Sequence, residues 1–415
     1  MSSDFWTSSH SRYHLHPRSS ILASRSLDLT YCTPRQLYCL HIYFAGLLQK
    51  LGKKLLLRQV PISTAIVFFK RFYLKNSICE TNPYLVLAAC AYVAAKIEET
   101  PVHIKSVVAE AKAVFAENSI KIFPADSSKL GEMEFYLLED LDFHLVVFHP
   151  YRALLAMTGR EPADGGRWSS TRVEEDQAAR KGKAPGAAEE SEEERIRRLM
   201  SRGSGEGLIE IDEGVLQICL FLINDTYRTD LPLLYPPYLI ALAALYIGYC
   251  LTSINSLNPS AASGGASQPR TRSSTQQSHP PTNPALGLPS PPSADFAAFI
   301  ASFQVSMPVL MACVQDVVVL YPIWEGFEPA QRAGPAGGSG SGSGGGSKGV
   351  LAGMAGMRAG MAAASGAAPG GGGKEESFGV AEAEALVRRM IEERAVDLMH
   401  PDDAGKQVIG KKRKA

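Results

Sequence analysis

The chain has 415 residues, which is enough for two or three domains. Hydrophobic residues make up 45% of it and charged residues 20%, so it can bury a core and is not disordered throughout. Lys+Arg and Asp+Glu both number 42, so no net charge points to nucleic acid or to an anionic membrane surface. The seven cysteines include no C-x-x-C pair, and most lie in apolar stretches. We expect reduced, buried thiols and no disulfide framework or zinc site.

The N-terminal segment, residues 1–32, contains no long apolar core and no signal-peptide layout. An intracellular chain is therefore expected. His10, His14 and His16 could approach a metal, but no convincing fourth ligand lies nearby. A solvated N-terminal segment is the favoured interpretation of these histidines.

Five helices are predicted in the next part of the chain. Thr33, Pro34 and Gln36 supply an N-cap, a first-turn proline and a capping-box glutamine for the first helix. A second helix is expected after Pro61. Apolar residues at helical spacing predict a fourth helix over 104–115 and a fifth over 130–141.

The third predicted helix begins at Pro83, after an Asn82 cap, and contains no charge before Lys96. A helix that is apolar all round belongs at the centre of a bundle. It should end before Pro101, because the residue preceding a proline disfavours helical geometry.

Part of this pattern recurs in the second half of the chain. "PYLVLAACAYVAA" begins at Pro83 and "PYLIALAALYIGY" at Pro237, with Pro, Tyr, Leu, Ala and Tyr identical in register. We therefore predict an all-α fold of two tandem helical bundles. The remaining helices of the second copy are expected at about 149–158, 212–228, 294–303 and 306–322.

Domain boundaries follow from the composition. Segments rich in Gly, Ser, Pro, Ala or mixed charge occur at about 159–207, 253–293 and 331–375. The first two are predicted to be disordered insertions in the second bundle, and the third a flexible part of the tail. The predicted units are the N-terminal segment, a first bundle over 33–148, a second over 149–328 and a Gly/Ala-rich tail over 329–415.

One uncharged stretch, residues 231–251, raises the alternative of a membrane protein. Its helical part can begin only near Pro236 and Pro237, which leaves roughly 22 Å of helix against a hydrocarbon core of ~30 Å. A buried core helix is favoured, and alkaline washing of membranes would distinguish the two.

Lys96 stands where the second copy has Cys250, so its role is specific to the first copy. A lysine alone would suit the negative C-terminal end of its helix, but Glu98 and Glu99 in the same turn have the unfavourable sign. Glu134 lies within the apolar arc of the fifth helix, where a carboxylate needs a cation or hydrogen bonds. Lys96 is the expected mate, either as an internal pair or as a pair that also contacts another chain.

Enzyme signatures are absent from the sequence. The glycine-rich runs match neither a P-loop nor a dinucleotide-binding motif, and no G-x-S-x-G or H-E-x-x-H occurs. No nucleophile partner or cofactor motif accompanies Lys96, so a catalytic amine is disfavoured. We expect no cofactor.

The residues also resemble a known family. Two helical repeats, with "AAKIEE" closing the third helix and a glutamate in the fifth, resemble a cyclin box followed by a degenerate second copy. Within cyclins, "LRQVPISTAIVFFKRFY", "EFYLLEDLDFHLVVFHPYR" and "NDTYRTD" followed by "LLYPP" are similar to the cyclin C subfamily of the RNA polymerase II Mediator kinase module. The opening "DFWTSSH" is similar as well.

This resemblance implies a regulatory subunit and not an enzyme. Cyclins activate a Ser/Thr kinase by docking the third and fifth helices of the first box on it, and Lys96 and Glu134 match the family's contact pair. Glu98 and Glu99 would belong to the same kinase-binding surface, and Phe5 and Trp6 would add a contact. The implied partners are a cyclin-dependent kinase and other Mediator kinase-module subunits, with no direct nucleic acid and no membrane.

The substrate-docking pattern of mitotic cyclins, Met-Arg-x-x-Leu, is absent from the first helix. An alternative is a transcription factor IIB-like protein, which also has two cyclin-type repeats but binds DNA. Against it, residues 34–150 hold 13 Lys+Arg and 11 Asp+Glu, and no zinc ribbon precedes them.

Two features of the tail leave alternatives open. Residues 378–399 predict a helix with one apolar face, which either packs on a partner or lies on solvent. The terminal basic run is either a nuclear-import signal, in keeping with an expected nuclear location, or a solvated tail. Its residues are Lys411, Lys412, Arg413 and Lys414.

Overall fold

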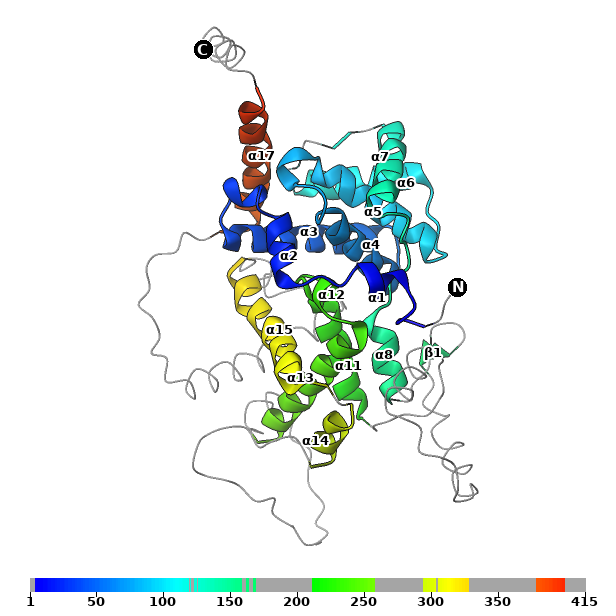
Figure 1. The fold of residues 1–415 in the computed structure, drawn as a ribbon. Coiled ribbons are helices and arrows are strands. Elements are labelled where there is room, and N and C mark those ends of the chain that lie inside the picture. Colours follow the sequence, from blue (N-terminus) through cyan, green and yellow to red (C-terminus); the bar gives the residue numbers. More distant parts are fainter. Residues whose placement is uncertain are drawn as a thin grey trace, which may run out of the picture.

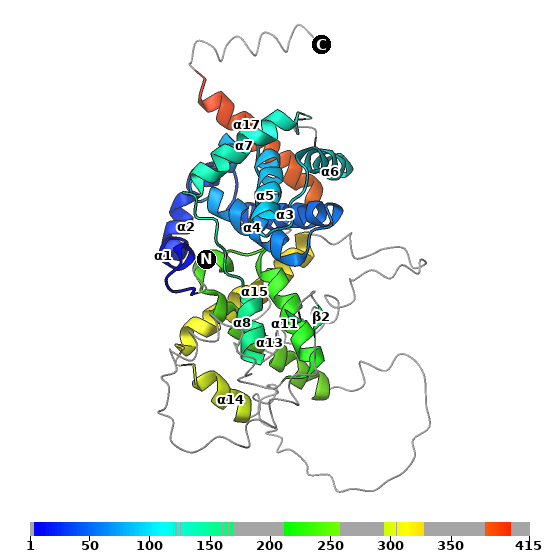
Figure 2. The ribbon, with the colours of Figure 1, turned by 90° about the vertical axis from the view of Figure 1, so that its right-hand side faces the viewer.

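The computed structural model describes residues 4–118, 120, 123–124, 126–158, 162–163, 167–168, 211–257, 294–303, 305–327 and 378–399. They form two groups of helices, one above the other in Figure 1, and the perpendicular view of Figure 2 agrees. The first bundle holds α3 (Pro34–Lys54), α4 (Gln59–Phe72), α5 (Pro83–Ile97), α6 (Ile104–Glu117) and α7 (Ser127–Asp140). The second holds α8 (Pro150–Thr158), α11 (Glu213–Thr226), α12 (Leu231–Leu234), α13 (Pro237–Leu257), α14 (Ala294–Ala301) and α15 (Met307–Phe327). The predicted all-α class is confirmed, and the two short strands β1 (Pro162–Ala163) and β2 (Arg167–Trp168) pair antiparallel.

Capping residues define the helix starts that the sequence predicts. The Thr33 hydroxyl accepts a hydrogen bond from the Gln36 N–H, and the Gln36 side chain accepts one from the Thr33 N–H, which closes the capping box of α3. The Asn82 side chain accepts hydrogen bonds from the first N–H groups of α5. These bonds satisfy donors that have no partner within their own helix.

An apolar helix lies at the centre of each bundle. In the first bundle α5 contacts α3, α4, α6 and α7, and in the second α13 contacts α8, α11, α12 and α15. Close approach of α11 to α13 requires Gly248, since a Cβ there would lie 2.8 Å from the Cys219 sulfur. All seven cysteines are free thiols, and all except the half-buried Cys250 are buried, as predicted.

Three helix boundaries differ from the prediction. Helix α4 begins at Gln59, before Pro61, because a proline in the first turn lacks only an N–H that would have no partner there. Helix α13 continues to Leu257, since no proline or glycine follows Gly248 within it. Helix α15 continues past Pro322 to Phe327.

Two apolar helices bear on the membrane alternative. At 21 residues α13 is longer than predicted, so its length no longer argues against a membrane span. Its residues 239–245 are nevertheless buried, against α8, α11 and α15. Among the described residues α15 is also long and apolar enough to span, but its buried positions follow one helical face that packs on α13, α11 and α3. Both are packed as core helices of the second bundle.

The N-terminal segment crosses the junction of the two bundles. It forms α1 (Ser9–Tyr13), α2 (Arg18–Ser24) and the 3₁₀ turn η1 (Asp28–Thr30). The His16 N–H donates to the Leu233 carbonyl of the second bundle, at 2.8 Å. His10 and His14 are buried, so the prediction of a solvated segment is wrong for them. Burial lowers the pKa of His14 to about 3, with Arg71 adding to the effect.

The predicted tail helix exists as α17 (Val380–Asp397) and packs on this chain itself. It lies against α3 and the 3₁₀ turn η2 (Ile78–Glu80), beside the first bundle in Figure 1. Its buried face consists of Ala383, Leu386, Val387 and Met390. Arg394 pairs with Glu80 at 2.6 Å. Neither predicted alternative, a partner or solvent, describes this face, because the first bundle covers it.

The described residues on either side of the two predicted insertions and of the predicted flexible part of the tail lie close together. Helices α8 and α11 pack on each other across the first one. The rings of Tyr249 and Phe296 stack at 4.1 Å across the second, and those of Phe327 and Phe378 at 5.9 Å across the third. Apart from β1 and β2 in the first segment and the last residues of α13 in the second, these segments and the basic run 411–414 lie outside the described residues. The described residues on either side of each segment therefore contact each other.

Candidate partner-docking site

The predicted pair of Lys96 and Glu134 forms where α5 and α7 pack together. Lys96 Nζ donates a hydrogen bond to Glu134 Oε1 at 2.6 Å. The Lys96 side chain is 39% exposed and that of Glu134 17% exposed, so a partner chain can reach both. Partial burial disfavours the ammonium, but the bonds to Glu134 and Tyr92 outweigh it and raise the pKa of Lys96 above its ordinary value.

Tyr92 is part of this site, and the sequence prediction missed it. It lies one helical turn before Lys96, and the ammonium sits 4.1 Å from the centre of its ring. A cation over an aromatic face is attracted by the ring, by roughly 0.5–1 kcal/mol at an exposed position. The i, i+4 spacing of an aromatic residue and a lysine was the available signal. Tyr92 and Glu134 thus hold the ammonium from two sides.

Glu98 and Glu99 have different environments although they are adjacent. The Thr64 hydroxyl donates to Glu98 Oε1 at 2.6 Å, so this carboxylate faces the protein's own α4. Glu99 is exposed and has a left-handed backbone, with φ of 54°. The Thr100 N–H donates to the Ala95 carbonyl at 2.9 Å, which closes a common motif at the C-terminal end of a helix. In this motif the position held here by Glu99 is normally glycine. Glu99 therefore presents the freer carboxylate at the end of α5.

Aromatic side chains next to Glu134 were also missed by the sequence prediction. Phe135 and Tyr136 on α7 are both more than half exposed. Exposed aromatic residues are common anchors in protein interfaces. The helical spacing of the apolar residues places both side chains off the buried face of α7. It does not show whether a side chain off that face is exposed or contacts another element.

Phe5 and Trp6 lie on the N-terminal segment, and their ring contacts are with residues other than Lys96. Phe5 is fully buried and packs edge-on against Phe148 and His10. Trp6 is 38% exposed and contacts the ring of Tyr238 on α13. In this chain Phe5 anchors the segment, and only Trp6 offers surface to a partner.

The "NDTYRTD" segment, residues 224–230, joins the two bundles. The Tyr151 hydroxyl donates to Asn224 at 2.6 Å, and Tyr227 bonds His149 at 2.6 Å. Arg228 donates to Gln49 of α3 at 2.8 Å. This polar segment therefore connects the second bundle to the first.

Asp230 ends that segment in a buried ion-pair network. It accepts two hydrogen bonds from Arg25, at 2.7 and 2.8 Å, and lies 3.5 Å from Lys70 Nζ. Burial alone would raise the pKa of Asp230, but Lys70 and Arg25 together hold it below the ordinary value. Burial lowers the pKa of Lys70 to about 8. One carboxylate thus ties α2 and α4 to the second bundle.

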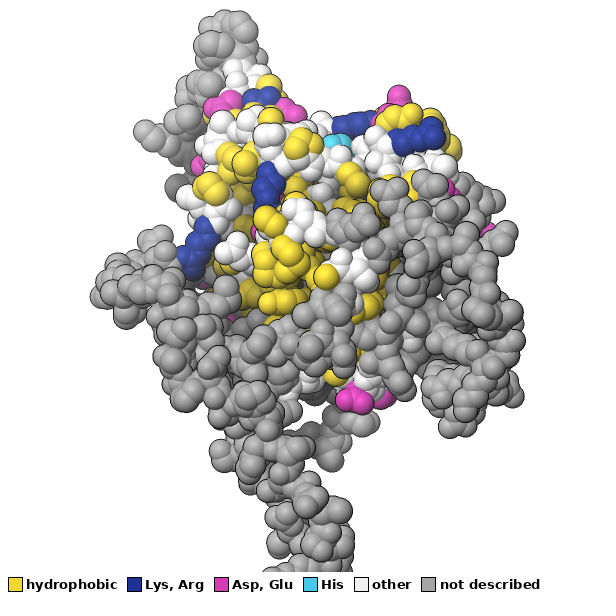
Figure 3. Space-filling view, turned by 60° about the horizontal axis from the view of Figure 1, so that its bottom comes forward, with side chains coloured by type: hydrophobic (Ala, Val, Ile, Leu, Met, Phe, Trp, Pro, Cys, Tyr) yellow, Lys and Arg dark blue, Asp and Glu magenta, His cyan; other side chains and the backbone are white. Residues whose placement is uncertain are grey.

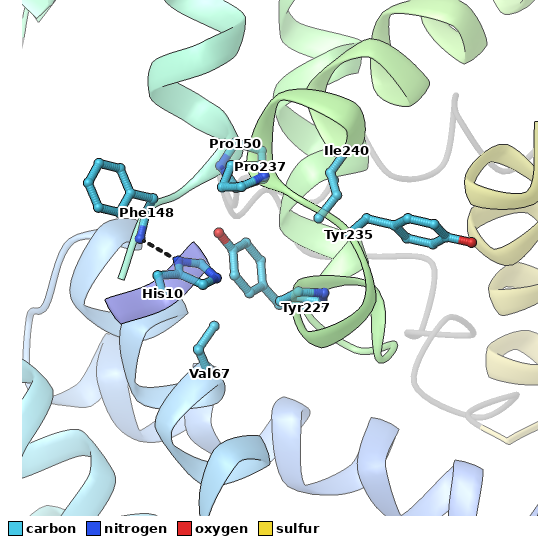
Figure 4. A pocket seen from close by; sticks show the side chains of 9 residues that line it. His10, Val67, Phe148, Pro150, Tyr227, Tyr235, Pro237 and Ile240 are labelled. Carbon is cyan, nitrogen blue, oxygen red and sulfur yellow. Dashed lines mark hydrogen bonds between the residues drawn. The ribbon is translucent and has the colours of Figure 1, made fainter. Parts of the chain in front are cut away.

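A small pocket lies at the same junction and does not involve Lys96. It is lined mainly by aromatic and proline side chains, with His10 and Tyr227 facing it (Figure 4). His10 Nδ1 accepts a hydrogen bond from the Phe148 N–H at 3.0 Å, as the dashed line in Figure 4 shows. Among the described residues no group of three or more His, Cys, Asp or Glu side chains could hold a metal ion.

Comparison with known proteins decides the family. The model of the cyclin N-terminal domain matches residues 41–146, the region that holds α5 and α7. The chain is 35% identical over 366 residues to an RNA polymerase II holoenzyme cyclin-like subunit of Mycosarcoma maydis, covering 81% of this chain and 93% of that protein. It belongs to this cyclin family. The same-named subunit of Saccharomyces cerevisiae is 31% identical, over 70% of this chain and 72% of that protein.

Solved structures give a more distant likeness. One chain of the yeast TFIIK complex is 18% identical, covers 75% of this chain and 98% of its own length, and has a TM-score of 0.42. The assignment rests on the sequence relatives. As a cyclin of this family, the chain is a regulatory subunit and not a catalytic one, and the IIB-like alternative is set aside.

Proposed function

We propose that this cyclin binds and activates a cyclin-dependent Ser/Thr kinase of the Mediator kinase module, and so regulates transcription by RNA polymerase II. The names of the sequence relatives, which are holoenzyme cyclin-like subunits, support this assignment. Other Mediator kinase-module subunits are its further proposed partners. The nucleus is its proposed location, because that is where RNA polymerase II acts.

The Lys96–Glu134 pair carries the proposal. Both side chains are held in place by partners within the chain, yet both keep exposed surface. An ion pair fixed in advance loses little side-chain entropy when a second protein binds it. Lys96 offers further N–H donors and Glu134 a second carboxylate oxygen, so the pair can bind polar groups of a kinase helix without breaking.

Glu99 and Trp6 extend the proposed kinase surface. Glu99 is exposed at the end of α5, and its carboxylate is suited to a basic side chain of the kinase. Glu98 lies beside it with its carboxylate bonded to Thr64. Trp6 is half-exposed on the N-terminal segment, which Phe5 anchors from inside.

The double variant Lys96→Ala, Glu134→Ala tests the proposal, because it removes the pair without leaving one charge unpaired. The kinase from the same organism should co-purify less well with the variant, and its activity toward a peptide substrate should fall at least tenfold. A matched control is Lys129→Ala, Glu132→Ala, which removes an exposed ion pair from the same helix α7. Unchanged co-purification and activity of the Lys96, Glu134 variant would show that the site is wrong.

A further inference from the structure

Helix α15 presents an apolar face to solvent. Its 21 residues include only two charged side chains, Asp316 and Glu325. The face opposite its buried side chains is exposed or half-buried, and only Gln315 on it is polar. We call this face the α15 stripe. It consists of Pro308, Met311, Ala312, Gln315, Val319 and Pro322, which follow one another at helical spacing.

A surface helix normally presents charged or polar residues to solvent, so folding alone does not explain the α15 stripe. Val319 is 50% exposed near its middle. A charge lies beside the stripe, where Asp316 forms an ion pair with Arg18 of α2. Figure 3, which brings the lower part of Figure 1 toward the viewer, shows hydrophobic side chains gathered near the centre of the described surface. Apolar side chains that gather on a surface indicate a binding site.

The sequence supplies an apolar segment next to this helix. Residues 328–377, which lie outside the described residues, connect the end of α15 to Phe378, and the Phe378 ring stacks on that of Phe327 at 5.9 Å. Within this Gly-rich stretch, residues 350–362 (VLAGMAGMRAGMA) contain a single charge. Four of their larger side chains recur at the spacing of one helical face: Val350, Met354, Met357 and Met361.

Residues 350–362 need another surface in order to form a helix. Gly353, Gly356 and Gly360 each disfavour a helix by roughly 1 kcal/mol relative to alanine. A helix of this length is also marginal in water by itself. Burial of the methionine face would offset both effects. Methionine side chains adapt to irregular apolar surfaces, which suits a stripe that contains two prolines.

We propose that residues 350–362 of this chain dock on the α15 stripe and cover it. This surface belongs to the second bundle, so the inference does not depend on the proposed kinase site. The 22 residues of 328–349 precede the segment, and a Gly- and Ser-rich chain of that length spans ~25 Å on average. The far end of the stripe, Pro308, lies about 29 Å along the helix from Phe327.

The attachment of the segment favours it over a separate protein. A tether whose average length matches the distance to its site gives a local concentration in the millimolar range. The return is also long enough, because the 15 residues of 363–377 can extend over about 50 Å before they reach Phe378. A segment of this chain is therefore the occupant that the connection supports best.

Oxidation of the segment's methionines by hydrogen peroxide tests the docking, because a covered thioether sulfur reacts slowly. Val319→Asp places a charge in the α15 stripe at an exposed position, so the fold should persist. In this full-length variant Met354, Met357 and Met361 should be oxidised at least fivefold faster than in the wild-type chain. Mass spectrometry of proteolytic peptides measures the rates.

Val396→Asp is the matched control. Val396 is 52% exposed and lies on α17, not on α15. This variant introduces the same charge at a similarly exposed valine, so the three methionines should be oxidised at the wild-type rate.

The reciprocal variant changes only the segment and leaves α15 intact. Replacing Met354, Met357 and Met361 together by glutamine should uncover the α15 stripe, so Met311 should be oxidised at least threefold faster. Leu351→Gln is the control, because Leu351 lies about 100° around a helix from Val350 and off the methionine face. This pair decides the question even if Val319→Asp does not fold.

Two results would overturn the inference. The first is a wild-type rate for Met311 in the triple glutamine variant, because the stripe would then not be covered by the segment. The second is a wild-type chain that sediments as a dimer and a Val319→Asp chain that sediments as a monomer, with unchanged oxidation of the segment. A second copy of the chain, and not residues 350–362, would then occupy the α15 stripe.

Discussion

The two bundles share a central helix pattern but use it differently. Tyr92 and Lys96 of α5 correspond in register to Tyr246 and Cys250 of α13. In the first bundle the lysine forms a half-exposed ion pair with Glu134 across two helices, whereas Cys250 is a half-buried thiol. Helix α5 ends at Ile97 in a left-handed turn, while α13 continues to Leu257.

This difference indicates a division of roles. The first bundle carries the exposed polar pair, the turns with left-handed backbone after α5 and α7, and the exposed aromatic side chains of α7. The second bundle contributes the "NDTYRTD" segment, whose Arg228 and Asp230 bond to α3 and α4 of the first bundle. One copy of the repeat thus supplies surface for a partner and the other supplies the junction that supports it.

The largest expected effect follows from breaking that junction. Asp230→Ala would leave Lys70 and Arg25 buried without their carboxylate, and we expect a loss of about 3–5 kcal/mol in unfolding free energy. Urea unfolding checks this. Asp316→Ala is the control, because its partner Arg18 is half-exposed, and its loss should not exceed about 1 kcal/mol. Equal losses would argue against a structural junction at Asp230.

The next largest loss of stability is expected from weakening the contact of the tail helix α17 with the first bundle. Met390→Ala empties part of the fully buried face of α17, and the loss should be about 2 kcal/mol. Hydrogen exchange should become faster in α17 and at η2 before it does so in the second bundle. Leu398→Ala, at an exposed position after α17, should change stability by no more than about 0.5 kcal/mol. A Met390 variant with unchanged exchange would contradict the packing of α17.

Acidification should weaken the junction through its neutral histidines. Burial lowers the pKa of His149 to about 3, so between pH 6.5 and about 3 the unfolded chain binds a proton that the folded chain does not. Stability should therefore fall as the pH falls, by up to about 1.4 kcal/mol per pH unit for each such histidine. His149→Gln should reduce this slope, and an unchanged slope would contradict a neutral, buried His149. Unfolding midpoints between pH 7 and 4 measure the slope for the variant and the wild type.

The smallest expected change in stability is at Glu99, in the turn that follows α5, whereas α13 continues past the matching position. Glu99→Gly places glycine in the left-handed position and should raise stability by up to about 1 kcal/mol. Kinase activation by this variant should nevertheless fall, since the exposed carboxylate is lost. Thermal unfolding measures the stability of the variant, and a peptide kinase assay measures how well it activates the kinase. Undiminished activation would remove Glu99 from the proposed kinase surface.

Much of the first bundle could be predicted from local sequence. The capping box at Thr33 and the Asn82 cap fix helix starts through bonds within four residues, so the sequence alone identifies them. The pairing of Lys96 with Glu134 was predictable because a carboxylate in an apolar arc needs a cation. That the pair binds a kinase stays a prediction.

Other features depend on contacts between distant segments. The apolar face predicted for the tail helix indicates that another element buries Met390. It does not indicate that this element is α3. Nothing local to His10 and His14 indicated that the junction buries them. Phe143, in the turn after α7, has a left-handed φ of 58°, a conformation that disfavours residues other than glycine, so a propensity argument misses it. Only the structure shows that α8 packs on α11, and Tyr249 on Phe296, across the two predicted insertions.

The stacked rings of Phe327 and Phe378 have a consequence for how the chain can vary. Because these two rings meet, α15 and α17 are positioned by their own contacts and not by the length of the chain between them. Doubling the length of a flexible connection between two fixed points costs only about 0.6 kcal/mol of closure entropy. A chain with more or fewer residues between Phe327 and Phe378 should therefore keep α17 in place on the first bundle at nearly constant stability.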